Sequence, residues 1–230
     1  MGLAAARHAR VVGGRRGNAL SAIGRSAATI VRPVIRRAVD IGVSSLGLLL
    51  SAPVIALAMI AIRLESRGAV IYRQRRAGLH GRPFEVLKLR TMVDGAERMG
   101  AGLAVNANDS RITRVGAFLR RISLDELPNL VNVLRGEMSL IGPRPTLPVQ
   151  VEQYTERQRG RLTIRPGITG WAQVNGRASL PWSERIELDL HYIEHRSLSL
   201  DLEILRRTVA MVLGGSGLYK GGAGGWEGEL

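Results

Sequence analysis

The sequence predicts a small α/β (mixed α+β) chain with one N-terminal membrane segment. Three observations support this class: an apolar run at residues 38–62, short alternating stretches at 69–92, and apolar positions at three- and four-residue steps across 182–213. With 230 residues and 45% hydrophobic content, the chain can form one small domain in addition to a membrane segment. We therefore expect a basic, disordered leader (1–32), a membrane helix (33–62), a folded domain (63–213) and a glycine-rich disordered tail (214–230).

The leader is strongly basic. Residues 1–39 contain eight arginines and no acidic residue, in a chain of net charge +14 whose only lysines are Lys88 and Lys220. Arginine binds phosphate groups bidentately, so the charge indicates phosphate-bearing partners. The leader could be a transit peptide, a nucleic-acid-binding arm or a tail beside an anionic phospholipid membrane. The apolar run that follows the leader favours the third alternative, a tail beside the membrane. No aromatic residue stands among these arginines to stack on bases, so we expect no nucleic acid partner.

The apolar run is long enough to cross a membrane as a helix, with Asp40 as its only charge. Arginines stand at both of its ends, and the positive-inside rule pulls both ends to the same, cytoplasmic side of the membrane. Pro53 removes one helical hydrogen bond and favours a bend. We expect a re-entrant helix–break–helix in which Ser51 bonds back to the preceding turn. A proline-kinked signal anchor is the alternative.

Two strands are expected directly after this segment. The stretches AVIYRQ and PFEVLKLRTM alternate in polarity and are separated by the turn-like AGLHGR, which is typical of a hairpin. The period of two places Lys88 and Arg90 on one face and Leu87 and Leu89 on the other. The basic face is either an anion-binding site or an ordinary solvated strand surface.

An acidic pair follows a predicted helix at 114–121. Ser123 and Glu126 have the spacing of a capping box for a second helix at 124–135, which places Asp125 and Glu126 in its first turn. The two acids either complement the helix dipole or carry chemistry. In the second case, helix-end amides would keep Asp125 ionised as a nucleophile, with Glu126 as a metal ligand or orienting base.

Further along the chain, the sequence contains candidate ligand-binding turns. Gly142-Pro143-Arg144-Pro145 is a rigid turn that makes Arg144 either a phosphate clamp or part of a structural turn. The stretch RPGITGWAQVNGR, from Arg165 to Arg177, contains residue types that line sugar or base pockets. His191 and His195 have the i, i+4 spacing of zinc ligands, but without a third ligand we interpret them as surface or interface histidines.

Four segments in order closely resemble the bacterial sugar transferases, the monotopic polyprenyl-phosphate phosphoglycosyl transferases that prime exopolysaccharide, O-antigen and glycoprotein glycan synthesis. The resemblance covers about residues 33–213. It rests on LLLSAPVIALAMIAI, KLRTM, SLDELPNLVNVLRGEMSLIGPRP and RPGITGWAQVNGR, of which the third is highly specific. Many relatives have Ser directly before the helix-breaking Pro, whereas here Ala52 stands between Ser51 and Pro53.

The resemblance implies one re-entrant membrane helix, amphipathic interface helices and a small α/β catalytic domain. It implies a Mg²⁺-dependent reaction in which Asp125 is phosphoglycosylated by a UDP-sugar, with release of UMP, before undecaprenyl phosphate takes the phosphosugar. Glu126 would help hold Mg²⁺. The residues expected to bind substrate are all basic: Lys88, Arg90, Arg144, Arg165 and Arg177. The sequence leaves open whether the chain forms a homodimer.

Overall fold

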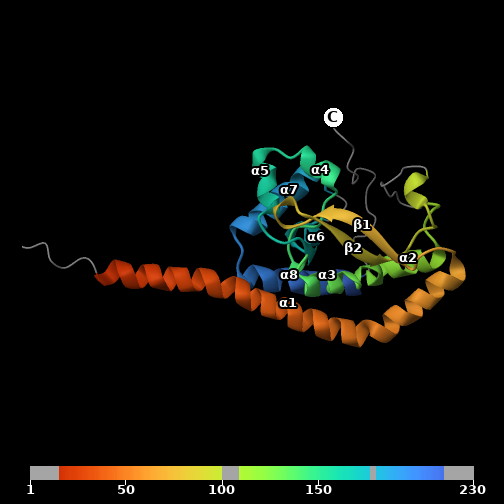
Figure 1. Cartoon of the computed structure of the whole chain (residues 1–230), viewed down its shortest axis with the longest axis horizontal. Coiled ribbons are helices and arrows are strands. Elements are labelled where there is room, and N and C mark those ends of the chain that lie inside the picture. The colour runs from red at the N-terminus through yellow and green to blue at the C-terminus, as the bar shows by residue number, and fades with distance from the viewer. Residues whose placement is uncertain (1–15, 100–108, 177–179, 215–230) are drawn as a thin grey trace, which may run out of the picture. The chain divides into compact units, whose positions relative to one another are not determined.

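The computed structural model describes residues 16–99, 109–176 and 180–214, with the backbone alone for 16–32. By contacts the chain divides into two units at residues 39 and 40, and the second contains all the elements after α1 (Figure 1). The helices are α1 (Arg16–Glu65), α2 (Arg114–Arg121), α3 (Asn129–Arg135), α4 (Pro148–Glu152), α5 (Glu156–Arg159), α6 (Trp171–Val174), α7 (Trp182–Glu194) and α8 (Leu198–Leu213). The strands are β1 (Ile71–Ala77), β2 (Pro83–Leu89), β3 (Ser139–Ile141) and β4 (Gly167–Thr169), and the 3₁₀ turns are η1 (Leu79–Gly81), η2 (Ala96–Arg98), η3 (Leu124–Glu126) and η4 (Gly160–Leu162).

Helix α1 is longer and more continuous than the sequence indicated. It begins at Arg16, inside the stretch expected to be disordered; residues 1–15 lie outside the described part of the chain. The predicted break is instead a bend in a continuous helix, which Figure 1 shows in its orange half. The Ser51 hydroxyl donates to the carbonyl of Gly47 at 2.6 Å, so the expected bond to the preceding turn is confirmed. Within the described residues, one helical stretch, Pro33–Glu65, is long and apolar enough to cross a membrane.

The end of α1 packs into the domain. Ala58 and Ile62 form a buried cluster with Leu89 of β2 and Leu119 of α2. Nearer its middle, the buried Asp40 carboxylate accepts hydrogen bonds from the Ser139 hydroxyl (2.8 Å) and the Leu140 amide (3.0 Å) of β3. The one acidic side chain of the apolar run is therefore satisfied by β3.

The predicted hairpin is confirmed. β1 and β2 are antiparallel, with Tyr72 opposite Lys88 and Ala77 opposite Pro83. A second pair, β3 and β4, is parallel and joins segments that the sequence did not identify as strands. These strands have three residues each, too short to show an alternating pattern.

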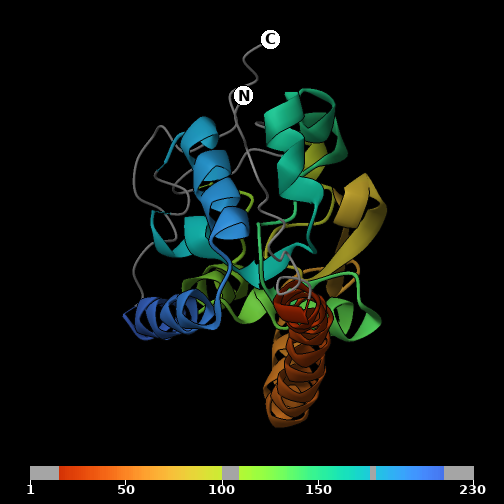
Figure 2. The same ribbon diagram turned by 90° about the vertical axis from the view of Figure 1, so that its left-hand side faces the viewer.

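Helices lie on two opposite sides of the strands. In both Figure 1 and Figure 2, α2, α3 and α8 lie on the lower side of the domain, while α4, α5 and α7 lie on the upper side. The predicted helix at 114–121 is confirmed as α2, and 182–213 forms the two helices α7 and α8. Helix α8 exposes Leu198, Leu202 and Val209 on one face and buries Ile204 on the other.

Candidate active site

Glu126 is the centre of an ion-paired cluster. Its Oε1 atom accepts from Lys88 Nζ at 2.7 Å and from an Arg144 guanidinium nitrogen at 2.9 Å. Only 13% of the Glu126 side chain and 20% of the Lys88 side chain are exposed, against 44% of Arg144. Burial lowers the pKa of Lys88, while Glu126 opposes this shift. The structure thus brings together residues 88, 126 and 144, which lie far apart in the sequence.

The segment carrying the acids differs from the predicted helix. Asp125 and Glu126 lie in the short 3₁₀ turn η3, and α3 begins only at Asn129. Ser123 adopts a left-handed conformation (φ 56°) and its side chain caps nothing, so the predicted capping box is wrong. The Glu126 carboxylate is already bound by two cations, which removes it from the capping role.

Asp125 has a different environment from its neighbour. Its half-buried carboxylate forms no hydrogen bond or ion pair with any residue that the structure describes. Burial and the charge of Glu126 raise the pKa of Asp125, whereas Lys88, Arg120 and Arg144 oppose the rise. The direction is opposite to the one expected from a helix dipole, because a three-residue turn presents no α-helix terminus.

The buried side chain of Asn132 fixes α3 against the strand that carries Lys88. Its Oδ1 accepts from the Leu87 amide at 3.1 Å, and its Nδ2 donates to the Glu85 carbonyl at 2.6 Å. Leu87 and Leu89 face the core as the period of two predicted. Lys88 therefore points from β2 toward the turn that carries Glu126.

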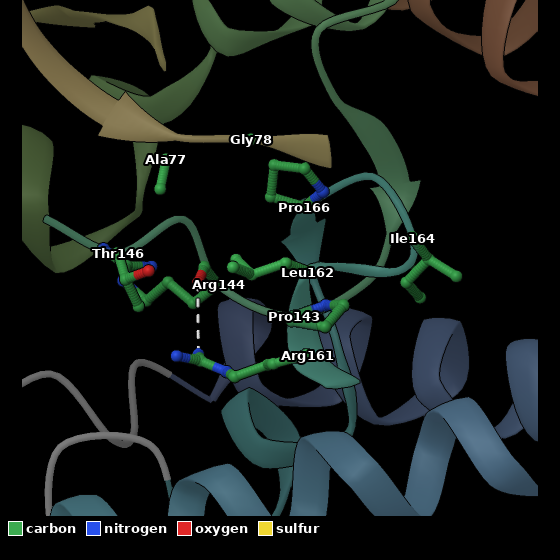
Figure 3. Close-up of a pocket in the computed structure, with 9 residues that line it drawn as sticks. All are labelled: Ala77, Gly78, Pro143, Arg144, Thr146, Arg161, Leu162, Ile164 and Pro166. Carbon is green, nitrogen blue, oxygen red and sulfur yellow. Dashed lines mark hydrogen bonds between the residues drawn. The ribbon is translucent and has the colours of Figure 1, made fainter. Parts of the chain in front are cut away.

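The turn after β3 holds Arg144. Gly142 permits a close approach to the chain before β4, because a Cβ atom there would lie 2.5 Å from the Arg165 carbonyl oxygen. Figure 3 shows Arg144 beside Pro143 and Thr146, with the Arg161 guanidinium pointing at its backbone carbonyl. Arg144 extends from this turn to Glu126.

Sequence reasoning missed basic and polar residues near the cluster. On β1, Tyr72, Gln74 and Arg76 recur at a period of two, opposite the face that carries Arg73 and Arg75. Burial and the neighbouring Arg144 lower the pKa of Arg76 to about 10. Arg120 donates to Thr91 Oγ1 at 2.7 Å and opposes the rise in the pKa of Asp125. The alternation of β1 was the available signal for Arg76; nothing in the spacing separated Arg120 from its basic neighbours.

Two predicted substrate-binding arginines lie elsewhere. Arg90 follows the last residue of β2 and is buried, with its guanidinium donating to the Ser66 carbonyl at 2.8 Å and hydroxyl at 2.9 Å, so the structure separates it from Lys88. Arg165 is exposed and donates to the Gly136 carbonyl at 2.8 Å rather than to Glu126. Arg177 lies outside the described residues.

The family model described as bacterial sugar transferase matches residues 31–215. The chain belongs to the bacterial sugar transferase family. The sugar transferase EpsL of Bacillus subtilis is 40% identical over 187 residues, covering 81% of this chain and 91% of EpsL. The exopolysaccharide production protein ExoY of Rhizobium meliloti is 37% identical over 206 residues, covering 82% of this chain and 91% of ExoY.

A larger relative has a more specific name. The UDP-glucose:undecaprenyl-phosphate glucose-1-phosphate transferase of Escherichia coli is 44% identical over 187 residues, covering 78% of this chain and 40% of that protein. This sugar transferase therefore matches nearly the whole of the small relatives and less than half of the Escherichia coli protein. The matched region, 31–215, contains the complete cluster of residues 88, 125, 126 and 144.

Proposed function

We propose that this sugar transferase moves a sugar 1-phosphate from a UDP-sugar to undecaprenyl phosphate and releases UMP, through a covalent intermediate on Asp125. The name of the Escherichia coli relative supports the donor and acceptor classes. The name of ExoY supports a role in exopolysaccharide production, in which we propose that this transfer is the priming step. O-antigen and glycoprotein glycan synthesis, which the family resemblance also implies, are the alternative pathways.

One observation carries the mechanism: the two adjacent carboxylates have different partners. Glu126 is bound by Lys88 and Arg144, while the Asp125 carboxylate has no ion pair among the described residues. A carboxylate engaged by two cations is a poor nucleophile, whereas an unpaired one with a raised pKa is more basic than an ordinary aspartate. Asp125 therefore suits attack on phosphorus, and Glu126 suits positioning.

The reaction then proceeds in two displacements. An Asp125 carboxylate oxygen attacks the phosphorus that carries the sugar, and the bond from this phosphorus to the bridging oxygen breaks, so that UMP leaves with the electron pair. In the second step a phosphate oxygen of undecaprenyl phosphate attacks the same phosphorus. The bond to Asp125 breaks and the free carboxylate returns. Lys88 and Arg144 neutralise charge on the phosphates during both steps.

The acids also fit the Mg²⁺ that the family implies. Asp125 and Glu126 supply hard carboxylate oxygens, and Mg²⁺ is usually held by one or two carboxylates together with substrate phosphates. In the described part of the chain, no group of three or more His, Cys, Asp or Glu side chains could hold a metal ion, so the diphosphate would supply the other ligands. When bound with the help of Glu126, Mg²⁺ would neutralise charge on the diphosphate.

The covalent step is tested without the lipid acceptor. Wild-type protein incubated with a panel of UDP-sugars and Mg²⁺ should release UMP stoichiometric with enzyme, and mass spectrometry should locate the phosphosugar on Asp125. Asp125→Asn should give neither product. Asp94→Asn, at an exposed acid outside the cluster, is the matched control and should behave as wild type. Release of UMP only when undecaprenyl phosphate is present would show direct transfer instead.

We further propose that the chain is a monotopic protein of the bacterial inner membrane, with both ends of the membrane helix at the cytoplasmic face. Arg36 and Arg37 precede the apolar run and Arg63 follows it, and α1 bends within it (Figure 1). The exposed apolar face of α8 suits an anionic membrane interface. Cysteines introduced at Gly17 and Gly102 should both be shielded from an impermeant thiol reagent in intact cells. Labelling at Gly17 would establish a spanning helix.

A further inference from the structure

We propose that a buried network centred on Arg161 positions Arg144 by holding its backbone carbonyl. The inference rests on the proposed function through the role of Arg144 at the phosphates. Arg161 is 4% exposed and lies below Arg144 in Figure 3, next to its backbone carbonyl. It therefore acts through another residue and is a positioning residue, without contact to substrate.

The Arg161 guanidinium uses all three of its nitrogens. Its Nε and one terminal nitrogen each lie 2.6 Å from Asp189 Oδ2, and the other terminal nitrogen donates to the Tyr154 hydroxyl at 2.5 Å. The nitrogen that faces Asp189 also donates to the Arg144 carbonyl at 3.1 Å, the dashed line in Figure 3. The Trp182 ring lies 5.2 Å from the guanidinium carbon. These partners come from the loop between α4 and α5, from α7 and from the Arg144 turn, so one side chain joins three parts of the domain.

Three successive backbone carbonyls of the turn, those of residues 143–145, each accept a hydrogen bond. The Pro143 carbonyl accepts from the Gly167 amide at 2.8 Å, the Arg144 carbonyl from Arg161, and the Pro145 carbonyl from Arg76 at 3.3 Å. The two prolines also fix their own φ angles. The backbone of the turn, and with it the direction in which the Arg144 side chain leaves the chain, is thereby fixed before any phosphate binds.

Burial of this ion pair is expensive and gives little stability by itself. Asp189 is 1% exposed, and well-packed apolar residues of similar volume can replace such a pair at no loss of stability. A planar guanidinium, however, presents donors in fixed directions that an apolar or ammonium group lacks. What this pair supplies is the fixed position of the Arg144 carbonyl.

The test is a double-mutant cycle on UMP release. Arg161→Lys keeps a cation beside Asp189 but removes the fork that reaches the Arg144 carbonyl, and should lower kcat/KM about tenfold. In an Arg144→Ala background the same substitution should cost nothing further. Arg157→Lys, at an exposed arginine of α5, is the matched control and should leave activity unchanged. Equal losses from Arg161→Lys in both backgrounds would show a general structural role and overturn the proposal.

A second variant and a second measurement cover the remaining outcomes. If Arg161→Lys does not fold, Tyr154→Phe removes one acceptor of the same guanidinium, and should lower kcat/KM about threefold only when Arg144 is present. Hydrogen exchange of residues 139–147 needs no turnover and should be faster in either variant than in Arg157→Lys. If exchange is faster in the variants but wild-type protein releases no UMP from any UDP-sugar, the proposed function is refuted while the role of the network in holding the turn stands. Unchanged exchange would refute that role.

Discussion

Opposite effects on stability are expected from neutralising the two adjacent acids. Glu126→Gln removes the charge that pairs with Lys88 and Arg144. The Lys88 hydrogen bond is mostly buried and contributes about 2 kcal/mol, while the exposed Arg144 contributes about 0.5 kcal/mol after solvent screening. For a chain of this size the combined loss lowers the unfolding midpoint by roughly 5–10 °C.

Asp125→Asn should instead stabilise the fold. Burial and Glu126 raise the folded-state pKa of Asp125 above its unfolded value, so the ionised carboxylate lowers the free energy of unfolding at neutral pH. Asparagine removes this cost, and we expect a gain of about 1 kcal/mol, or roughly 2–4 °C. The gain should begin to shrink as the pH falls below the raised pKa of folded Asp125 and should vanish below the unfolded-state pKa, where the wild-type carboxyl is neutral in both states.

Thermal unfolding of the purified protein in detergent measures both shifts, and UMP release should be lost in both variants. Glu203→Gln is the matched control, because Glu203 also accepts from two arginines, Arg207 at 2.7 Å and Arg206 at 3.3 Å, on the exposed surface of α8. Its midpoint should change by less than about 2 °C. Shifts of the same sign in Asp125→Asn and Glu126→Gln would refute the distinction between the two acids.

Two further predictions concern pH and the membrane helix. The raised pKa of Asp125 and the lowered pKa of Lys88 should narrow the pH range of activity from both sides. The acid limb of kcat/KM should lie at a higher pH than an ordinary Asp would give, and the alkaline limb at a lower pH than an ordinary Lys would give. Lys88→Arg should move the alkaline limb to higher pH. Asp40→Ala leaves two buried donors unsatisfied and should cost about 3 kcal/mol, measured by unfolding, whereas Ser139→Ala removes one donor and should cost about 1 kcal/mol. Equal costs would contradict this account of Asp40.

Local patterns predicted the hairpin and α2. Alternation across residues 71–89 and the turn between its halves are short-range signals, and the structure reproduces them. The sequence could not predict the parallel pairing of Ser139 with Gly167, since that pairing depends on contacts between distant segments. The short turn η3 was not predicted for the same reason: the ion pairs of Glu126 with Lys88 and Arg144, which are distant in the sequence, replace the helix cap that its spacing from Ser123 indicated.

For the candidate site, sequence patterns identified residue types better than their partners. Lys88, Arg144 and the acids lie together, as the resemblance implied. Arg90 satisfies the same alternation as Lys88, but β2 ends at Leu89 and the next side chain turns toward Ser66. The Arg161 network was missed because its members are spread from Tyr154 to Asp189 and share no periodicity.

Asp40 gives the membrane helix a fixed position along its own axis relative to β3. A helix advances about 1.5 Å per residue, so sliding α1 by one residue would move the Asp40 carboxylate by about that distance away from the position in which it accepts both hydrogen bonds. The second of these bonds ends on Leu140, two residues before the glycine that begins the Arg144 turn. The axial position of α1 and the placement of Arg144 are thus linked through β3, and in the proposed mechanism this link would set the height of the active site above the bilayer core.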